Sequence, residues 1–380
     1  MVTEHAPTPP STRRTWLGQF AIAGLSPWLG RAAWANAPAK PATLLAAWQT
    51  PDTPQIGLVE VGATQWQVAR AMAVPTRAHG LAVEPGGSVL AVARRPGDWL
   101  LRWHPLSGHN QWQWIEGDRR FNGHVAASPQ GTALWTTETD LETGQGLLGV
   151  RDRASLQKTA EWPTLGPDPH ALMVLPQPLG RIPAGSLIVA NGGIPVLPET
   201  GRAKRHPERM DASLLALDPR TGAVLGQWRL SDPYLSIRHL AWDAVFRRLG
   251  VALQAEHPDL AQRQAAPVLA VWDGAQLVSS VAQPGLQGYG GDICARPGGG
   301  FVVSCPRSDA VALFTPAAVW QSNQPHRDAC ALAAQAHQWW VSGADGVLTL
   351  APSTSPRLVR GVAMQPPIQF DNHCLPWASA

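Results

Sequence analysis

Short apolar runs alternate with turn residues along most of this chain, and the alternation recurs as a repeat. In each copy a His or Asp starts a run of small and apolar residues, a Gly or Pro turn follows, and a second apolar run ends the unit, as in HVAASPQGTALWTTET from residue 124. Runs of this kind between turn residues predict β-strands joined by tight turns. The copies begin at His79, His124, His170, His239, Asp292 and Asp328, and a last fragment begins at His373.

The spacing of the copies predicts a β-propeller, because a period of roughly 40–50 residues matches one four-stranded blade. The second copy contains four strand-like segments, at 124–129, 132–139, 147–153 and 156–163. The fragment HCLPW supplies only one inner strand, whereas residues 43–75 supply three strands without a preceding His. We therefore expect an all-β fold of about seven blades, closed by strands from both termini so that no sheet edge is exposed. Because the sixth repeat is weakly patterned, a count one lower or one higher is the alternative.

The N-terminal residues have a different pattern, that of an export signal. STRRTWL at residues 11–17 resembles the twin-arginine motif, a modest apolar run follows, and Ala33-Trp34-Ala35 offers a small-x-small cleavage site. The apolar run is short and Pro27 interrupts it, which argues against a membrane span. We expect a twin-arginine signal peptide over residues 1–35, a single propeller domain over residues 36–380, and a periplasmic location.

Composition narrows the classes of partner. The chain has 30 Lys and Arg against 27 Asp and Glu, and removal of residues 1–35 brings the formal charge close to zero. A near-neutral protein lacks the attraction that nucleic acid or an anionic membrane requires.

The 18 Trp are expected to pack mainly between sheets. The motifs of zinc proteases, nucleotide-binding loops and EF-hands are absent, and that of serine hydrolases is absent outside the export segment, so those mechanisms lose support.

Four cysteines occur, and none shows the spacing of a zinc ribbon or an attached c-type haem. The twin-arginine route exports folded chains, so thiols can fold reduced. We expect buried thiols in preference to one disulfide, which an oxidising compartment would also permit. The cysteines are Cys294, Cys305, Cys330 and Cys374.

The repeat also gathers side chains that could bind a ligand. Since each His or Asp stands at the start of an innermost strand, all seven are expected at one mouth of the central channel, near Arg77, Arg238 and Arg327. Imidazole nitrogens ligate transition metals, and guanidinium groups hold anions. The alternatives are histidines that serve only the blade turn, as in the Gly-His pair of WD-type repeats, and histidines that act as acid or base. The candidate metal ligands are His79, His124, His170, His239 and His373, and the candidate ligand-binding residues are Arg77, Arg238, Asp292 and Asp328.

Two further polar features stand apart from this group. Glu138 and Asp140 in the segment TTETD could hold a cation, but solvated loop carboxylates are the preferred interpretation. The segment from Pro195 to Asp211 is expected to be a long loop and a candidate for a functional elaboration.

Eight short segments together form a recognisable set: RAHG at 77–80, FNGH at 121–124, TTETD at 136–140, ANGGI at 190–194, HPERM at 206–210, LSIRHL at 235–240, YGGDI at 289–293 and DNH at 371–373. They resemble a proteobacterial family of exported propellers known as domain of unknown function 1513. The resemblance covers essentially the mature chain. At 166–171, GPDPHA lacks the Glu that the family usually shows there, which puts a carboxylate role at that place in doubt.

The resemblance implies a fold related to the quinoprotein amine dehydrogenase β-chain and to WD40-like propellers, but not that activity. It also implies an iron-uptake context, because genes of this family often lie near those of imelysin-type and di-haem-peroxidase-like proteins. We therefore hypothesise a monomeric periplasmic propeller that binds iron or copper, or a metal-bearing anionic ligand, among periplasmic iron-uptake proteins. The alternatives are an oxidoreductase or lyase that uses the same histidines, and an interaction scaffold; a non-enzymatic role is preferred.

Overall fold

The computed structural model describes residues 41–115, 117–195, 210–335, 338–350, 357–361 and 368–378. The described residues belong to one compact unit, residues 39–380. They form an all-β fold, as expected, with one short α-helix, α1 (Leu260–Ala265), and one 3₁₀ turn at Pro306–Ser308 among them. The expected signal peptide over residues 1–35 lies outside the described residues, and so do residues 196–209 of the expected loop.

Five consecutive antiparallel sheets of four strands form most of the fold. The first two contain β4 (Ala78–Val83), β5 (Val89–Ala93), β6 (Trp99–Trp103) and β7 (Asn110–Trp114), then β8 (Arg119–Ala127), β9 (Ala133–Asp140), β10 (Gly146–Asp152) and β11 (Lys158–Pro163). The third contains β12 (Pro169–Val174), β13 (Leu187–Asn191), β14 (Ser213–Leu217) and β15 (Val224–Trp228). The last two contain β16 (Leu235–Asp243), β17 (Arg248–Ala255), β18 (Leu269–Trp272) and β19 (Leu277–Ser279), then β20 (Ile293–Ala295), β21 (Phe301–Cys305), β22 (Ala310–Phe314) and β23 (Trp320–Pro325).

The two ends of the folded chain meet in an eight-stranded closed barrel. Its strands are β1 (Ala42–Gln49), β2 (Pro54–Val61), β3 (Gln65–Ala73), β24 (Leu332–Gln335), β25 (Gln338–Gly343), β26 (Gly346–Leu350), β27 (Arg357–Gly361) and β28 (Gln369–Pro376). The C-terminal β28 pairs antiparallel with β1, with Leu44 opposite Pro376, so the predicted sharing of one sheet by both ends is confirmed.

The barrel differs from the expected set of separate blades. Two short parallel contacts close it: Leu332 pairs with His373 between β24 and β28, and Arg360 and Gly361 pair with Gln65 and Trp66 between β27 and β3. All other pairings in the barrel are antiparallel. The strands β24–β27 therefore approach the terminal sheet, which consists of β28, β1, β2 and β3, closely enough to share backbone hydrogen bonds.

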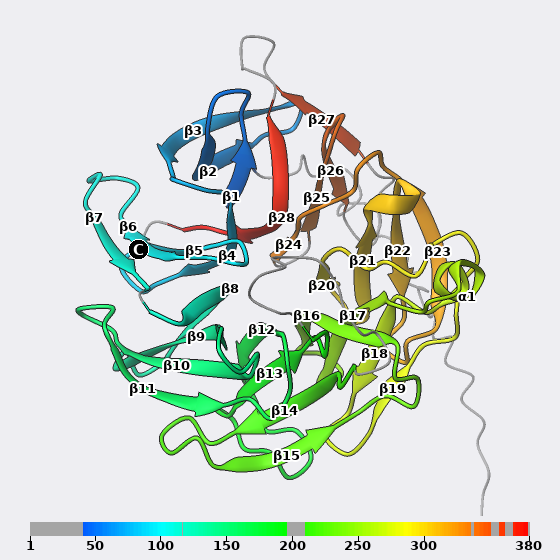
Figure 1. The fold of residues 1–380 in the computed structure, drawn as a ribbon. Coiled ribbons are helices and arrows are strands. Elements are labelled where there is room, and N and C mark those ends of the chain that lie inside the picture. Colours follow the sequence, from blue (N-terminus) through cyan, green and yellow to red (C-terminus); the bar gives the residue numbers. More distant parts are fainter. Residues whose placement is uncertain are drawn as a thin grey trace, which may run out of the picture. The chain divides into compact units, whose positions relative to one another are not determined.

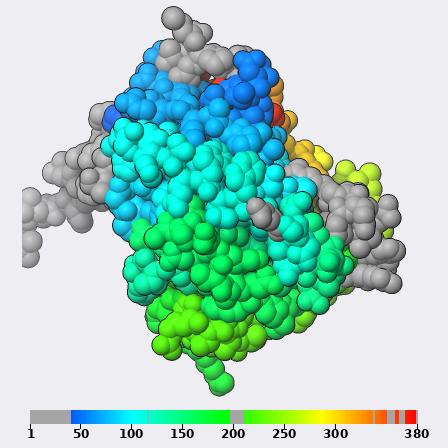
Figure 2. All heavy atoms as spheres, turned by 60° about the vertical axis from the view of Figure 1, so that its left-hand side comes forward, coloured from blue at the N-terminus to red at the C-terminus, as the bar shows by residue number. Residues whose placement is uncertain are grey.

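The sheets are arranged around a common centre, with the first strand of each repeat innermost. Figure 1 shows β4, β8, β12, β16, β20, β24 and β28 nearest the centre, and β7, β11, β15 and β19 at the periphery. In Figure 2 the segments coloured blue, cyan and green lie next to one another in sequence order, as consecutive sheets that pack side by side must do. The expected placement of the repeat's first strand is thus confirmed.

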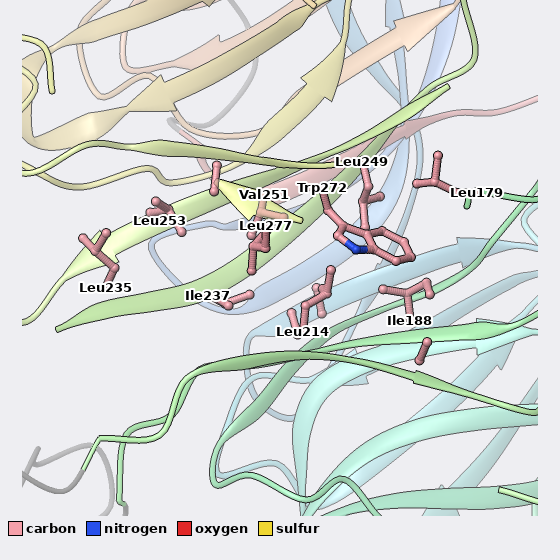
Figure 3. Packing of buried hydrophobic residues seen from close by; sticks show 14 of the residues in the cluster. Leu179, Ile188, Leu214, Leu235, Ile237, Leu249, Val251, Leu253, Trp272 and Leu277 are labelled. Atoms are coloured by element: carbon pink, nitrogen blue, oxygen red, sulfur yellow. The ribbon is translucent and has the colours of Figure 1, made fainter. Parts of the chain in front are cut away.

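Apolar side chains fill the spaces between neighbouring sheets. Trp272 packs with Leu214 and Ile188 between the third and fourth sheets (Figure 3). Trp99 packs in the cluster between the terminal sheet and the first repeat, and Trp48 packs within the barrel. All three Trp are fully buried, as expected for packing residues, whereas Trp114 and Trp320 are exposed. Among the described residues, no helix is both long and apolar enough to span a bilayer.

Candidate metal centre

Each candidate histidine lies at a β-bulge in its innermost strand. Two residues face one at His79 on β4, at His170 on β12 and at His239 on β16, where the pairing with the next strand shifts register. Three residues face one at His124 on β8 and at His373 on β28. A bulge bends the strand and redirects a side chain that regular alternation would place on a sheet face. The repeat thus presents a histidine toward the centre from five strands.

Two glycines allow the first two of these strands to approach each other. Gly123 has a φ of +102°, and a Cβ on it would lie 2.8 Å from Cδ2 of His79. A Cβ on Gly80 would lie 2.2 Å from the carbonyl oxygen of Gly123. The rings of His79 and His124 are therefore able to meet edge to face, with centroids 4.9 Å apart.

The structure brings the five imidazoles into one cluster, as the sequence predicts. Ligand nitrogens of His79, His124, His170 and His239 all lie within 4.8 Å of one another. Nε2 of His170 is 3.4 Å from Nε2 of His79 and 2.9 Å from Nε2 of His239. Two nitrogens bound to one metal ion at about 2.0–2.1 Å in tetrahedral geometry are about 3.3–3.4 Å apart. The separation of 3.4 Å between His79 and His170 matches this value, and the separation of 2.9 Å between His170 and His239 is shorter, so a shared ion would require a small shift of the His239 ring.

A second group of potential ligands shares one histidine with the first. His239, Asp292 and His373 also bring one ligand atom each within 4.8 Å of the others. Nδ1 of His373 is 3.3 Å from Oδ1 of Asp292, and the backbone N–H of Leu332 donates to Oδ2 of Asp292 at 2.9 Å. The ring of His373 lies 4.5 Å from that of His239. Asp292 thus supplies one carboxylate at the side of the imidazole cluster.

Burial determines the protonation of the cluster. The exposed fractions of His79, His124, His170 and His239 are between 2% and 9%. Burial lowers the pKa of all four well below the usual value, and neighbouring imidazoles lower it further. Among the described residues, the buried Nε2 of His124 has no hydrogen-bond partner. Neutral rings with available lone pairs are the form of histidine that binds metal ions.

A polar cavity of about 160 Å³ adjoins the cluster on one side. Two carboxylates hold arginines beside it: Arg238 and Arg95 both contact Asp168, while Arg77 and Arg94 both contact Asp371. The cavity is lined by His79, His170, His239, Arg94, Arg95, Arg238, Arg307, Gln254, Tyr289 and Asn372.

The predicted ligand-binding residues divide into those at the centre and those away from it. Arg238 lines the cavity and Asp292 lies in the cluster, whereas Arg77 is turned to Asp371 and does not line the cavity. The structure does not bring Asp328 to the group: it is exposed, with a left-handed φ of 51°, and its N–H donates to Asp309. Three residues separate Asp328 from the start of β24, whereas Asp292 directly precedes β20.

Sequence reasoning missed several residues that line the cavity. Arg94 and Arg95 directly follow the second strand of the first repeat, and Arg307 follows the second strand of the fifth. Tyr289 and Asn372 lie inside segments that carry the family resemblance. The available signal was the position of arginines just after second strands, which end at the same edge of the sheets as the first strands begin.

The acidic segment after residue 136 is not a solvated loop, so that interpretation is wrong for Glu138. Its carboxylate is fully buried and accepts from Arg151 at 2.6 Å and from Lys158 at 3.1 Å. Asp140 lies 3.3 Å from Arg119. Cations of the chain itself therefore neutralise these carboxylates.

All four cysteines are free thiols, and three are buried. Burial raises the pKa of each, to about 12 for Cys305 and Cys330, which keeps them protonated at neutral pH.

The sequence matches the family described as "Protein of unknown function (DUF1513)" over residues 72–376. A search of curated proteins finds no match.

Solved structures of similar fold include hydrazine synthase from Kuenenia stuttgartiensis, at a TM-score of 0.60 and 11% identity over 80% of this chain and 93% of that one. They also include virginiamycin B lyase from Staphylococcus aureus, at 0.53 and 12% over 78% and 91%. A catalytically inactive variant of that lyase, in which one histidine is replaced by alanine, was solved with quinupristin and matches at 0.53 and 12% over 76% and 85%. At identities this low, the likeness shows a propeller-like fold alone.

Proposed function

This chain belongs to the DUF1513 family, and from that premise we propose that it binds a transition-metal ion at the centre of its sheets. His79, His124, His170 and His239 are the proposed ligands, and His373 and Asp292 are proposed to complete the site or to hold a second ion beside it. One observation carries the proposal: four ligand nitrogens from four strands, far apart in sequence, lie within 4.8 Å of one another. Imidazole groups suit iron, copper, zinc and nickel.

The contacts between imidazoles of different sheets support metal binding over a purely structural role. Histidines that serve only a turn would be expected to satisfy both ring nitrogens within their own blade. Here the closest polar neighbours of the Nε2 atoms of His79 and His239 include Nε2 of His170, which comes from another sheet. A metal ion at this point would accept these lone pairs together.

The proposed fold at full detail is a ring of seven blades. The run β28–β1–β2–β3 and the run β24–β25–β26–β27 are each antiparallel, as the five separate sheets are. Among the described residues, the strand pairing between these two runs consists of the short parallel contacts. This supports counting the barrel as two neighbouring blades.

The proposed setting is the periplasm, and the proposed role is binding or delivery of iron or copper in iron acquisition. The twin-arginine-like segment STRRTWL and the family resemblance support this setting.

Fractionation of cells that express the full chain, with an Arg13→Lys/Arg14→Lys variant as the comparison, tests the export step. Retention of the variant in the cytoplasm together with periplasmic wild-type protein is expected. Cytoplasmic wild-type protein would contradict it.

Metal analysis of the natively exported protein tests the binding proposal. We expect about one equivalent of iron or copper per chain. His124→Ala should lose most of this metal, because the change removes one of the four proposed ligands and the packing that orients the other three rings. His109→Ala is the matched control, since His109 is an exposed histidine in a turn. A wild-type protein that takes up no first-row transition metal, as isolated or after incubation with Fe²⁺ or Cu²⁺, would overturn the proposal. Uptake of zinc alone would overturn only the identity of the metal.

The second candidate function is catalysis, as an oxidoreductase or lyase. The observation that favours it is the same neutral cluster beside an open cavity, because a neutral imidazole in contact with a substrate accepts a proton. The lyase of similar fold that loses activity with one histidine is consistent with such a use of this fold. Turnover that disappears in His239→Ala while unfolding remains cooperative would favour this candidate over binding alone.

A further inference from the structure

The cavity beside the imidazoles has a strongly cationic lining. Four arginines line it, Arg94, Arg95, Arg238 and Arg307, and no Asp or Glu is among the described residues that line it. Guanidinium groups bind carboxylate and phosphate oxygens through paired hydrogen bonds. The cavity is therefore suited to a small oxyanion.

The carboxylates of this region lie behind the arginines, where they hold them in place. Arg238 is almost fully buried and donates to Oδ2 of Asp168 at 2.8 Å, and Arg95 contacts the other oxygen of the same carboxylate. Asp371 holds Arg94 at 3.7 Å. Each acidic residue thus fixes two arginines at once, so a bound anion would meet preorganised donors.

The outer wall of the cavity is fixed differently. The guanidinium of Arg307 lies 4.0 Å from the ring centroid of Tyr289, in a cation–π arrangement. Arg307 is exposed, so it stands at the entrance. The amides of Gln254 and Asn372 add neutral polar groups to the lining.

The same cavity is open to the proposed metal ligands. His79, His170 and His239 line it together with the arginines, and Nε2 atoms of these three histidines are the ones in mutual contact. An anion in the cavity would lie next to an ion held by those nitrogens.

We propose that this cavity binds a small oxyanion, a carboxylate or phosphate, which is gripped by Arg94, Arg95, Arg238 and Arg307 and gives one oxygen to the metal ion. The inference rests on the proposed function, because it assigns an exchangeable ligand to the same ion, in addition to the side chains proposed above. No bond is made or broken other than coordination. The anion and the metal ion then bind with positive coupling, since each provides a contact that the other needs.

Spectroscopy of the Co²⁺-loaded full-length protein tests the inference, because the visible bands of Co²⁺ respond to an exchangeable ligand. We expect oxalate, citrate or inorganic phosphate to shift these bands saturably, and the three anions tested separately to distinguish carboxylate from phosphate as the source of the oxygen. Arg307→Ala is expected to weaken the effective anion at least about tenfold, because a hydrogen bond to a charged group is lost. Co²⁺ stoichiometry should not change, since Arg307 is exposed and is not among the proposed metal ligands.

The matched control is Arg296→Ala, which removes an arginine from a different cavity, lined by Cys294, Cys374 and the ends of β16, β20, β24 and β28. It should leave the titration unchanged. Arg94→Ala provides a second variant at the proposed site, with the same expected weakening.

The outcomes separate this inference from the function on which it rests. Stoichiometric Co²⁺ binding whose spectrum none of the three anions alters would overturn the oxyanion and leave the metal site intact. An anion response that Arg307→Ala and Arg94→Ala do not weaken, or that Arg296→Ala weakens equally, would overturn the assigned location. Absence of Co²⁺ binding would overturn the metal proposal, and this inference with it.

Discussion

At the scale of single residues, burial changes what the histidines can do. The four buried imidazoles have pKa values well below the ordinary value of 6.5, because desolvation and neighbouring rings disfavour the charged form. In an unfolded chain the same residues take up protons near pH 6.5. The unfolded state therefore binds more protons than the folded state below that pH.

This difference predicts that the metal-free protein loses stability as the pH falls below about 6.5. The sign follows from proton linkage: stability falls with pH wherever the unfolded state binds more protons, by up to about 1.4 kcal/mol per pH unit for each such histidine. Thermal unfolding between pH 8 and pH 5 measures it. His124→Gln should flatten the dependence, and a wild-type midpoint that stays constant over this range would contradict the expectation.

Glu138 shows the cost of removing one member of a buried ion pair. Its carboxylate is fully buried against Arg151, whose side chain is 2% exposed. Glu138→Ala should destabilise the fold by about 3–5 kcal/mol, because Arg151 is left charged and unpaired. Asp345→Ala is the control: the pair between Asp345 and Arg327 is exposed, where water and salt screen the attraction, so its loss should have little effect on stability. Urea unfolding of both variants gives the comparison: Glu138→Ala should lose much more stability than Asp345→Ala, and equal losses would refute the argument.

At the scale of the element, the bulge in each innermost strand is the device that builds the site. A regular strand would place alternate side chains on the two faces of its sheet, where they pack against neighbouring sheets. The register shifts at His79, His124, His170, His239 and His373 interrupt that alternation over two or three residues in each strand. Glycines beside two of these histidines then permit the close approach of β4 and β8.

Gly123→Ala should therefore lower metal affinity as well as stability. The new Cβ would collide with the ring of His79, and the positive φ adds strain of about 1 kcal/mol. Gly108→Ala is the matched control, since Gly108 has a positive φ of 75° but open space around the position of a Cβ. Both variants should lose some stability, and only Gly123→Ala should lose metal affinity, by about tenfold or more. Titration with Co²⁺ distinguishes them, and equal affinities would contradict the role assigned to Gly123.

At the scale of the whole molecule, closure depends on the last strand. β28 pairs with β1, contacts β24, and carries His373 into the cluster. The two ends of the folded chain are adjacent, since the N–H of Trp377 donates to the carbonyl of Thr43 at 2.9 Å. The first and last strands of the folded chain are therefore neighbours in space.

A circular permutant should fold and keep the metal site. Residues 378 and 41 would be joined by a short Gly/Ser linker, and new ends would be opened in the exposed turn at residues 106–109. Cooperative thermal unfolding and unchanged Co²⁺ stoichiometry are expected. Deletion of residues 369–380 is the contrasting change, because it exposes the edge of β1 and removes His373; it should abolish cooperative unfolding. A deleted chain that melts like the wild type would show that β28 does not close the fold.

Much of the architecture was predictable because it depends on local pattern. The strands of the second repeat, predicted at 132–139 and 147–153, lie at Ala133–Asp140 and Gly146–Asp152. The convergence of five histidines also followed from the repeat, since equivalent positions in equivalent strands must point to one centre. The sequence could not predict that Asp328 lies outside the histidine cluster. Its position depends on the conformation of the three residues between it and the start of β24.

The sequence by itself determined an all-β chain of repeated four-strand units, the joining of its two ends, and the histidines at its centre, because period, turn chemistry and hydrophobic alternation act over short stretches of backbone. Only the tertiary structure decided that bulges turn those histidines together, that Glu138 is buried against Arg151, and that Arg94, Arg95 and Arg307 line a cavity with them. Such contacts join residues of different sheets, and their distances depend on how the whole ring closes.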